Sequence, residues 1–225
     1  MTDRPSAAGS AQTAGAGLGD DPVPGATAAL WVGTFQALAN RVAHDLRNAL
    51  NGVAVNLEVV RGRSARGAEV SAIAPFAATA AAQFEAASAA AEALLALARP
   101  LSGNPDVADT AAQLGRLLGL RSSGPLAITD ATRGRGGTPV PGDLVRAVVA
   151  RSVLNALDVG DEVACETTVD GDIFLRVTAA LHVPPPDPEL VAAASAYGVR
   201  FVSQGNVLEV RFPAAGARAT PSVPA

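Results

Sequence analysis

A long run of apolar residues at helical spacing lies near the start of the chain. Between residues 27 and 61 these residues recur every third or fourth position, as they do along one face of an α-helix. The members of this stripe are Trp31, Phe35, Leu38, Val42, Leu46, Ala49, Val53, Leu57 and Val60. Thr27 is placed to cap the helix, and the glycine- and arginine-rich segment 62–67 is placed to end it in a turn. The pattern predicts a helix longer than most in globular proteins.

A second helix is predicted over residues 69–99, where Pro100 stops it. Pro75 suits the first turn of a helix, so a start near Ala74 is an alternative. The apolar residues expected to face the first helix are Val70, Ile73, Ala77, Phe84, Ala87, Ala91, Leu94, Leu95 and Ala98. Two such helices form an antiparallel hairpin, which cannot cover both of its stripes alone. Two copies can do so as a four-helix bundle, so a homodimer through residues 26–101 is predicted.

The chain after residue 105 mixes short helices with strands. The predicted helices cover residues 106–120, 143–158 and 189–197, and the predicted strands cover 125–129, 163–169, 172–178, 199–203 and 206–212. Asp170-Gly171 and Gln204-Gly205 each predict a hairpin turn. Helices combined with mostly hairpin-linked strands are typical of an α+β sandwich, here over residues 106–213.

The composition narrows the classes of function. The net charge of −4 argues against the basic face of a nucleic-acid-binding protein. The single cysteine, Cys165, cannot form an internal disulfide and fits a reducing compartment. The start of the chain lacks the pattern of a signal peptide, and the apolar stretch 72–98 is too weakly hydrophobic for a membrane span. We expect a soluble cytoplasmic protein with disordered tails at 1–25 and 214–225, and neither nucleic acid nor a membrane as partner.

The candidate chemistry lies on the first helix, opposite its apolar stripe. At 100° per residue, His44 points roughly 160° away from the centre of the stripe, toward solvent. Arg47 and Asn48 lie one turn along on either flank of His44, where i,i+3 and i,i+4 side chains meet. Asp45 follows His44 directly, and Asn51 continues the same face. An imidazole, a carboxylate, a guanidinium and a carboxamide are therefore expected on one exposed surface.

These four side chains suit the transfer of a phosphoryl group to the imidazole. An exposed imidazole is largely neutral at cytoplasmic pH, so one ring nitrogen is a free nucleophile. Asp45 supplies a base or an orienting carboxylate, and Arg47 supplies positive charge for the developing anion. Asn48 is placed to bond a phosphoryl oxygen or to hold an attacking water. The alternative is that His44 is simply a solvated residue on the outer face of a helix.

The segment His44-Asp45-Leu46-Arg47-Asn48-Ala49-Leu50-Asn51 resembles the phosphoacceptor box of bacterial two-component histidine kinases. That box contains His, an acid, an aliphatic residue, Arg, Thr or Asn, Pro and Leu. The resemblance implies that His44 is phosphorylated and that Asp45 assists as a base. It also implies that Asn48 holds the water used when such proteins dephosphorylate a response regulator. Ala49 departs from the pattern, because the family usually has Pro there.

The order of elements after residue 105 resembles the ATP-binding sandwich of the same family. Residues 148–158 are similar to its N-box helix, with Asn155 at the position of the magnesium-binding Asn and Arg151 replacing an earlier Asn. The Asp-x-Gly-x-Gly segment, the second glycine-rich segment and the mobile lid have no counterpart, since residues 178–184 contain neither a carboxylate nor a glycine. The resemblance therefore implies a reduced sandwich of the histidine-kinase ATPase type, and no cofactor or metal is expected.

Four further features receive structural interpretations. The run Gly134-Arg135-Gly136-Gly137 lacks the Lys and the spacing of a phosphate loop and is interpreted as a flexible linker. Asn155 is interpreted as a capping or packing residue. His182 has no second ligand at metal spacing and is interpreted as a surface residue. Cys165 alternates within a strand and is interpreted as an inert, packed thiol.

Three hypotheses about function remain open. The first is a dimeric phosphorelay protein, resembling the histidine phosphotransferases derived from histidine kinases. In it, His44 exchanges a phosphoryl group with the Asp of response-regulator receiver domains while the sandwich serves as a docking surface. The second is a histidine autokinase with a divergent nucleotide pocket, which predicts that ATP labels His44. The third is a catalytically silent dimeric binding protein, whose partner binding does not depend on His44.

Overall fold

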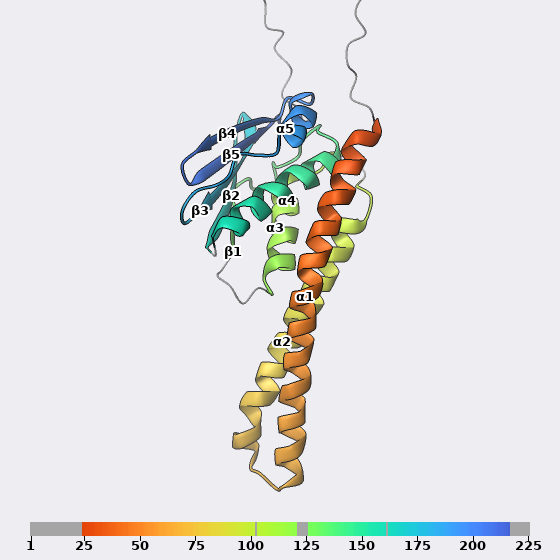
Figure 1. The fold of residues 1–225 in the computed structure, drawn as a ribbon, viewed down its shortest axis with the longest axis vertical. Helices are drawn as coiled ribbons and strands as arrows, with labels where there is room; N and C mark the ends of the chain where they lie inside the picture. The colour runs from red at the N-terminus through yellow and green to blue at the C-terminus, as the bar shows by residue number, and fades with distance from the viewer. Residues whose placement is uncertain (1–23, 102, 121–125, 161, 217–225) are drawn as a thin grey trace, which may run out of the picture.

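The computed structural model describes residues 24–101, 103–120, 126–160 and 162–216, which form a long helical hairpin with a sandwich packed against its upper half (Figure 1). The elements in chain order are α1 (Pro24–Ala65), α2 (Val70–Ala98), α3 (Val107–Leu118), β1 (Leu126–Asp130), α4 (Gly142–Val159), β2 (Val163–Asp170), β3 (Asp172–Ala179), α5 (Pro188–Ser195), β4 (Arg200–Gln204) and β5 (Val207–Phe212). None of the described helices is both long and apolar enough to cross a lipid bilayer.

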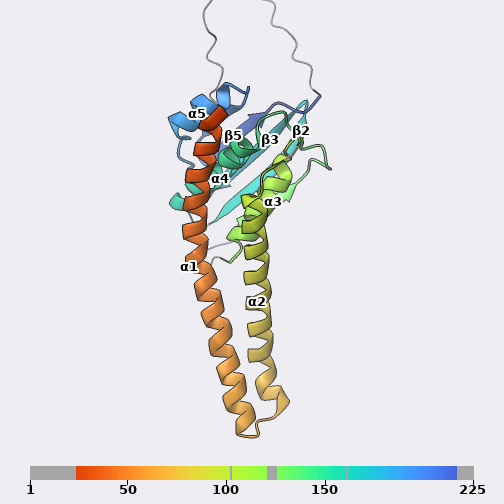
Figure 2. The ribbon, with the colours of Figure 1, turned by 90° about the vertical axis from the view of Figure 1, so that its right-hand side faces the viewer.

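The helices α1 and α2 form the predicted antiparallel hairpin, which extends well beyond the sandwich (Figure 2). The helix α1 begins at Pro24, a residue suited to the first helical position, so Thr27 is buried inside the helix and does not cap it. The helix also continues to Ala65, through most of the predicted turn. The helix α2 begins at Val70 and contains Pro75, so the alternative start near Ala74 is wrong. The predicted tail covered residues 1–25, but Pro24 and Gly25 belong to α1, and residues 1–23 lie outside the described residues.

The buried face of α2 differs from the predicted one. The residues of α2 that are buried are Ala80, Ala87, Ala90, Ala93 and Leu97. Phe84 and Leu95, which were expected to face the first helix, are 57% and 60% exposed. Small side chains allow two helices to pack closely, because the distance between helix axes depends on the residues at the contact. The alanine-lined face of α2 therefore packs inward and leaves larger apolar residues outside.

The strands form one sheet in the order β1-β2-β3-β5-β4. The strand β1 runs parallel to β2, and every other neighbouring pair is antiparallel. Both predicted hairpin turns are present, with Gly171 at φ 72° and Gly205 at φ 59°, a region that favours glycine. The predicted α+β fold class, with a helical hairpin before a sandwich, is confirmed.

The helix α4 joins the sandwich to the hairpin. It packs against β2 and β3 on one side and against α1 on the other, and nearly all of its residues from Leu144 to Val153 are buried. A single core cluster contains residues of α4, the sheet and the upper part of α1, including Leu30, Leu38 and Val42. The upper part of the α1 stripe is therefore covered by the sandwich of its own chain, where the sequence predicted a second copy.

The segment between β1 and α4 is folded, so its interpretation as a flexible linker is wrong. The carbonyl of Gly136 accepts a hydrogen bond from the N–H of Val107 at 3.0 Å, and the carbonyl of Gly137 accepts one from Ala215 at 2.8 Å. A Cβ at Gly136 would lie 2.5 Å from the carboxylate of Asp106, which caps α3 by accepting from the N–H of Asp109. Glycine is thus needed here for close packing. The bond to Ala215 also ties the start of the predicted C-terminal tail to this loop, and residues 217–225 lie outside the described residues.

Candidate functional site

His44 lies near the middle of α1 on the face turned to solvent. Its side chain is 71% exposed, as the helical spacing predicts. On the opposite side of the same helix, Val42 is 1% exposed and Leu46 is half-buried against the core. Packing on that side fixes the helix, so the imidazole is presented from a rigid element. Asn51 is also exposed, in agreement with its predicted place on this face.

Asp45 orients the imidazole. The Nδ1 atom of His44 lies 3.2 Å from Oδ1 of Asp45, whose side chain is 20% exposed. An ionised carboxylate only accepts hydrogen bonds, so this contact is favourable when Nδ1 carries the proton and donates it. An unprotonated Nδ1 would instead set its lone pair against the carboxylate oxygen. Asp45 therefore favours the tautomer in which Nδ1 carries the proton and Nε2 keeps its lone pair, and in that tautomer the Asn48 amide, 3.5 Å from Nε2, can donate only to Nε2.

Asn48 joins His44 and Asp45, whereas Arg47 stays apart from them. The Nδ2 atom of Asn48 lies 3.2 Å from Nδ1 and 3.5 Å from Nε2 of His44, so the carboxamide sits against the ring. Arg47 is exposed and forms no hydrogen bond or ion pair with another described residue. The structure thus brings together three of the four predicted site residues, and the guanidinium of Arg47 remains available to a partner.

A groove of about 500 Å³ opens beside His44. Residues from α1, α2 and the end of α3 line it: Asp45, Asn48, Ala49, Thr79, Ala82, Gln83, Ala86, Gly119 and Leu120. Most of the side chains from α2 are small, which leaves the groove open toward the acceptor face. A partner that reaches His44 from this side therefore contacts the hairpin and the sandwich together.

An ion pair that the sequence did not predict lies one turn from His44. Arg41, one turn before His44, places Nη1 2.6 Å from Oδ1 of Asp158 at the end of α4. The side chains of Arg41 and Asp158 are 32% and 62% exposed. Because the two residues are 117 positions apart in the chain, no local pattern could have paired them.

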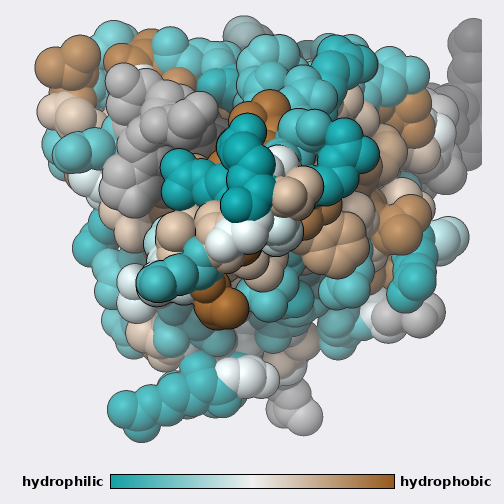
Figure 3. Space-filling view, turned by 90° about the horizontal axis from the view of Figure 1, so that it is seen from below, coloured by the Kyte–Doolittle hydropathy of each residue, from teal (hydrophilic) through white to brown (hydrophobic). Residues whose placement is uncertain are grey.

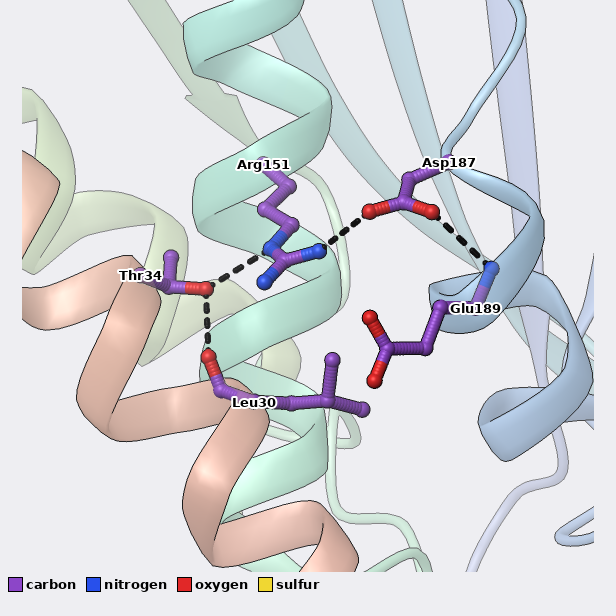
Figure 4. A network of polar contacts seen from close by, with 5 residues as sticks. All are labelled: Leu30, Thr34, Arg151, Asp187 and Glu189. Carbon is purple, nitrogen blue, oxygen red and sulfur yellow. Dashed lines mark hydrogen bonds and ion pairs between the residues drawn. The ribbon is translucent and has the colours of Figure 1, made fainter.

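Arg151 is engaged in a network between α1, α4 and α5 (Figure 4). Its Nε donates to Oγ1 of Thr34 at 2.8 Å, and its Nη1 donates to Oδ2 of Asp187 at 2.6 Å. Thr34 donates in turn to the carbonyl of Leu30, and Asp187 accepts from the N–H of Glu189. The Arg151 side chain therefore holds the hairpin to the sandwich.

Arg146 makes a second connection at the top of the hairpin. It is 2% exposed, and its guanidinium donates to the carbonyls of Arg99 at 2.7 Å and Ala96 at 3.2 Å, at the C-terminal end of α2. The guanidinium also lies 5.6 Å from the centre of the Trp31 ring, within range of a cation–π interaction. Burial lowers the pKa of Arg146, and the charges of Asp143 and Asp109 oppose that shift. Two arginines within an apolar predicted helix were the sequence signal for these connections.

The remaining candidates have no active role in the structure. Asn155 is half-buried on α4 and forms no hydrogen bond with another described residue. His182 is exposed, as interpreted from the sequence. Cys165 is 1% exposed, and burial raises the pKa of its thiol to about 12, which makes it unreactive. Within the described ranges, no three His, Cys, Asp or Glu side chains cluster in a way that could hold a metal ion.

The sequence matches no protein-family model, and no curated protein matches it. The solved structures to which the chain is similar include a bacterial phosphotransferase, at 14% identity and a TM-score of 0.39, covering 84% of this chain and 96% of that chain. They also include the Acinetobacter baumannii histidine kinase AdeS, at 11% identity and a TM-score of 0.38, covering 76% of this chain and 97% of that chain.

Proposed function

We propose that this chain is a phosphotransfer protein of two-component signalling. His44 accepts a phosphoryl group from the aspartate of one response-regulator receiver domain and passes it to a second receiver or to water. The observation that carries the proposal is the 71% exposed imidazole whose Nδ1 lies 3.2 Å from the Asp45 carboxylate. That contact keeps the lone pair on Nε2, and attack requires the Asn48 amide, 3.5 Å away, to turn from this nitrogen to the phosphoryl oxygens. The resemblance of residues 44–51 to a phosphoacceptor box supports the same role.

The transfer step needs only groups that the two proteins supply. The lone pair of Nε2 forms the new P–N bond, and the P–O bond to the receiver aspartate breaks and returns its electron pair to that carboxylate. The proton on Nδ1 stays there, and Asp45 offsets the positive charge that the ring gains. Arg47 and the carboxamide of Asn48 bond the phosphoryl oxygens. For hydrolysis, Asn48 holds the attacking water instead.

The sandwich in this proposal is a docking surface that does not hold ATP. Arg151 occupies an N-box position and bonds Thr34 and Asp187, and residues 178–184 lack the carboxylate and glycines of the kinase family. Titration calorimetry with ATP and magnesium is therefore expected to give no binding heat, and labelled ATP is expected to leave His44 unlabelled. Saturable ATP binding together with labelling of His44 would favour the autokinase instead.

We further propose that two copies associate through the lower half of the hairpin, residues 46–84. Leu50 and Leu57 are 50% and 52% exposed, and their spacing of seven places them on one face of α1. On α2, Val70 and Phe84 are 81% and 57% exposed. The end-on view from below shows hydrophobic side chains scattered among hydrophilic ones (Figure 3). Burying these side chains in a four-helix bundle would remove them from water.

The dimer is tested by changing exposed leucines at two places. The double variant Leu50→Asp/Leu57→Asp is expected to sediment as a monomer in analytical ultracentrifugation at a concentration where the wild type is a dimer. Leu181→Asp is the matched control, because Leu181 is 73% exposed on the sandwich and is expected to leave the dimer intact. A monomeric wild type, or equal dissociation by both variants, would contradict this interface.

Phosphotransfer is tested with receiver domains loaded by a small acyl-phosphate donor and then incubated with the chain in the absence of nucleotide. The wild type is expected to remove label from a cognate receiver, and His44→Ala is expected to abolish that removal. His182→Ala controls for loss of an exposed imidazole elsewhere, and it is expected to retain full transfer. A receiver panel that shows no His44-dependent loss of label would overturn the proposal.

A further inference from the structure

Arg41 is the charged side chain that connects the acceptor turn to the sandwich. Its Nη1 lies 2.6 Å from Oδ1 of Asp158, in the last turn of α4. Both side chains are partly exposed, at 32% and 62%, so solvent screens the ion pair and it is easily exchanged. The connection therefore differs from the buried one made by Arg146, and it lies one turn from His44.

Arg41 and His44 are neighbours on the surface of α1, because residues spaced i,i+3 lie on adjoining turns of one helix face. In the unphosphorylated chain the Arg41 guanidinium is held by Asp158, and the His44 ring lies against Asp45 and Asn48. A phosphoryl group on Nε2 would thus place strong negative charge within reach of the Arg41 guanidinium.

The phosphoryl group competes well with Asp158 for this guanidinium. A phosphoryl group presents three strong acceptor oxygens and more negative charge than one carboxylate, and the planar fork of arginine bonds two of those oxygens at once. Asp158 offers a single contact in an exposed pair. Phosphorylation of His44 therefore favours exchange of Arg41 from Asp158 to the phosphoryl group.

We propose that Arg41 is a phosphoryl-binding residue that switches between Asp158 and phosphorylated His44, and so reports the state of His44 to the end of α4. This inference rests on the proposed function. The exchange forms and breaks only hydrogen bonds and ion pairs. The covalent step is unchanged: the P–O bond to the receiver aspartate breaks and the P–N bond to His44 forms. When His44 is phosphorylated, Asp158 loses its partner, and the last turn of α4 becomes free to respond to a receiver.

Two variants that remove the same ion pair distinguish the switch from a structural bond. Arg41→Gln removes the phosphoryl ligand, and it is expected to slow transfer from a phosphorylated receiver to His44 by about tenfold. Asp158→Asn removes only the competitor, and it is expected to raise that rate. Equal losses in both variants would show a structural role and overturn the inference, as would an unchanged rate in Arg41→Gln. Failure of the wild type to transfer would overturn the proposed function, and the inference with it.

Hydrogen exchange provides a readout that does not depend on variant folding. In the wild type, amides in the last turn of α4 are expected to exchange faster when His44 is phosphorylated, because Asp158 has lost Arg41. Arg41→Lys keeps the positive charge but lacks the planar guanidinium that bonds two oxygens at once. It is expected to show a smaller change in hydrogen exchange on phosphorylation than the wild type, and a smaller loss of transfer rate than Arg41→Gln. Identical exchange of this turn in the two states of the wild type would contradict the switch.

Discussion

The upper and lower halves of the hairpin carry the same kind of apolar stripe but have different surroundings. In the upper half, Leu38 and Val42 are buried at 0% and 1% exposure beneath α4. In the lower half, Leu57 and Phe84 are 52% and 57% exposed. The sandwich thus buries the apolar stripe of the upper half, and the apolar side chains of the lower half stay exposed to solvent. His44 lies between the two halves, where a dimer and a docked receiver would both be close to it.

The largest expected effect comes from matched leucine truncations in the two halves. Leu38→Ala is expected to lower the free energy of unfolding by about 2–5 kcal/mol, because it leaves a cavity in the core. Leu57→Ala is expected to change that free energy by less than about 0.5 kcal/mol in the monomer, since Leu57 is already exposed there. Urea unfolding at a protein concentration below dimer formation measures both. Similar losses for the two variants would contradict the contrast between the halves.

Next in size is loss of the buried connection at the top of the hairpin. Arg146→Ala is expected to lower the free energy of unfolding by about 1–3 kcal/mol, because the partly buried hydrogen bonds to the carbonyls of Ala96 and Arg99 are lost. Arg41→Gln, which removes the exposed ion pair beside His44, is expected to lower the free energy of unfolding by no more than about 1 kcal/mol. Thermal and urea unfolding of the two variants compare them directly. If Arg41→Gln lost more stability than Arg146→Ala, the ion pair of Arg41 would be a fixed structural contact, contrary to this account.

A smaller effect on stability is expected when the pH is lowered, through Asp130 at the edge of the sheet. The hydroxyl and the backbone N–H of Thr132 donate to the carboxylate of Asp130 and hold its pKa below the ordinary value of 3.8. The resulting stability is present above the unfolded pKa and is lost as the pH falls through the folded pKa. Asp130→Asn is expected to lower stability at pH 7 by less than about 1 kcal/mol, since solvent screens this exposed carboxylate.

The unfolding midpoint in urea, measured at neutral pH and near pH 3, tests this prediction. The difference between Asp130→Asn and the wild type is expected to shrink at the lower pH, where the wild-type carboxylate is becoming protonated. If the two proteins differed by the same amount at both pH values, the charge of Asp130 would contribute nothing to the stability of the fold.

Local patterns predicted much of the fold and of the acceptor face. The helical spacing of apolar residues placed His44 in solvent, and the Asp-Gly and Gln-Gly pairs located both hairpin turns. The inward face of α2 was predicted wrongly, because hydrophobicity favours Phe84 whereas close packing selects alanine. Helical spacing also placed Arg47 and Asn48 symmetrically, but only the carboxamide rests against the ring.

Contacts between distant parts of the chain could not be predicted in this way. Nothing in the first helix indicates that α4 covers its upper stripe, and nothing near Arg41 indicates its bond to Asp158. The loop around Gly136 has the composition of a linker, yet long-range backbone hydrogen bonds from Val107 and Ala215 fix it. These contacts depend on the tertiary arrangement, which a periodic pattern does not contain.

The most direct test of the phosphoacceptor role is to locate the phosphoryl group after transfer. The chain is incubated with a phosphorylated receiver domain in the absence of nucleotide, digested at neutral or alkaline pH and examined by mass spectrometry. The expected result is a single phosphoryl group on the peptide that contains His44, attached at Nε2. Phosphoryl on another residue, or loss of receiver phosphate to water with His44 unmodified throughout, would contradict the proposal that this imidazole is the acceptor.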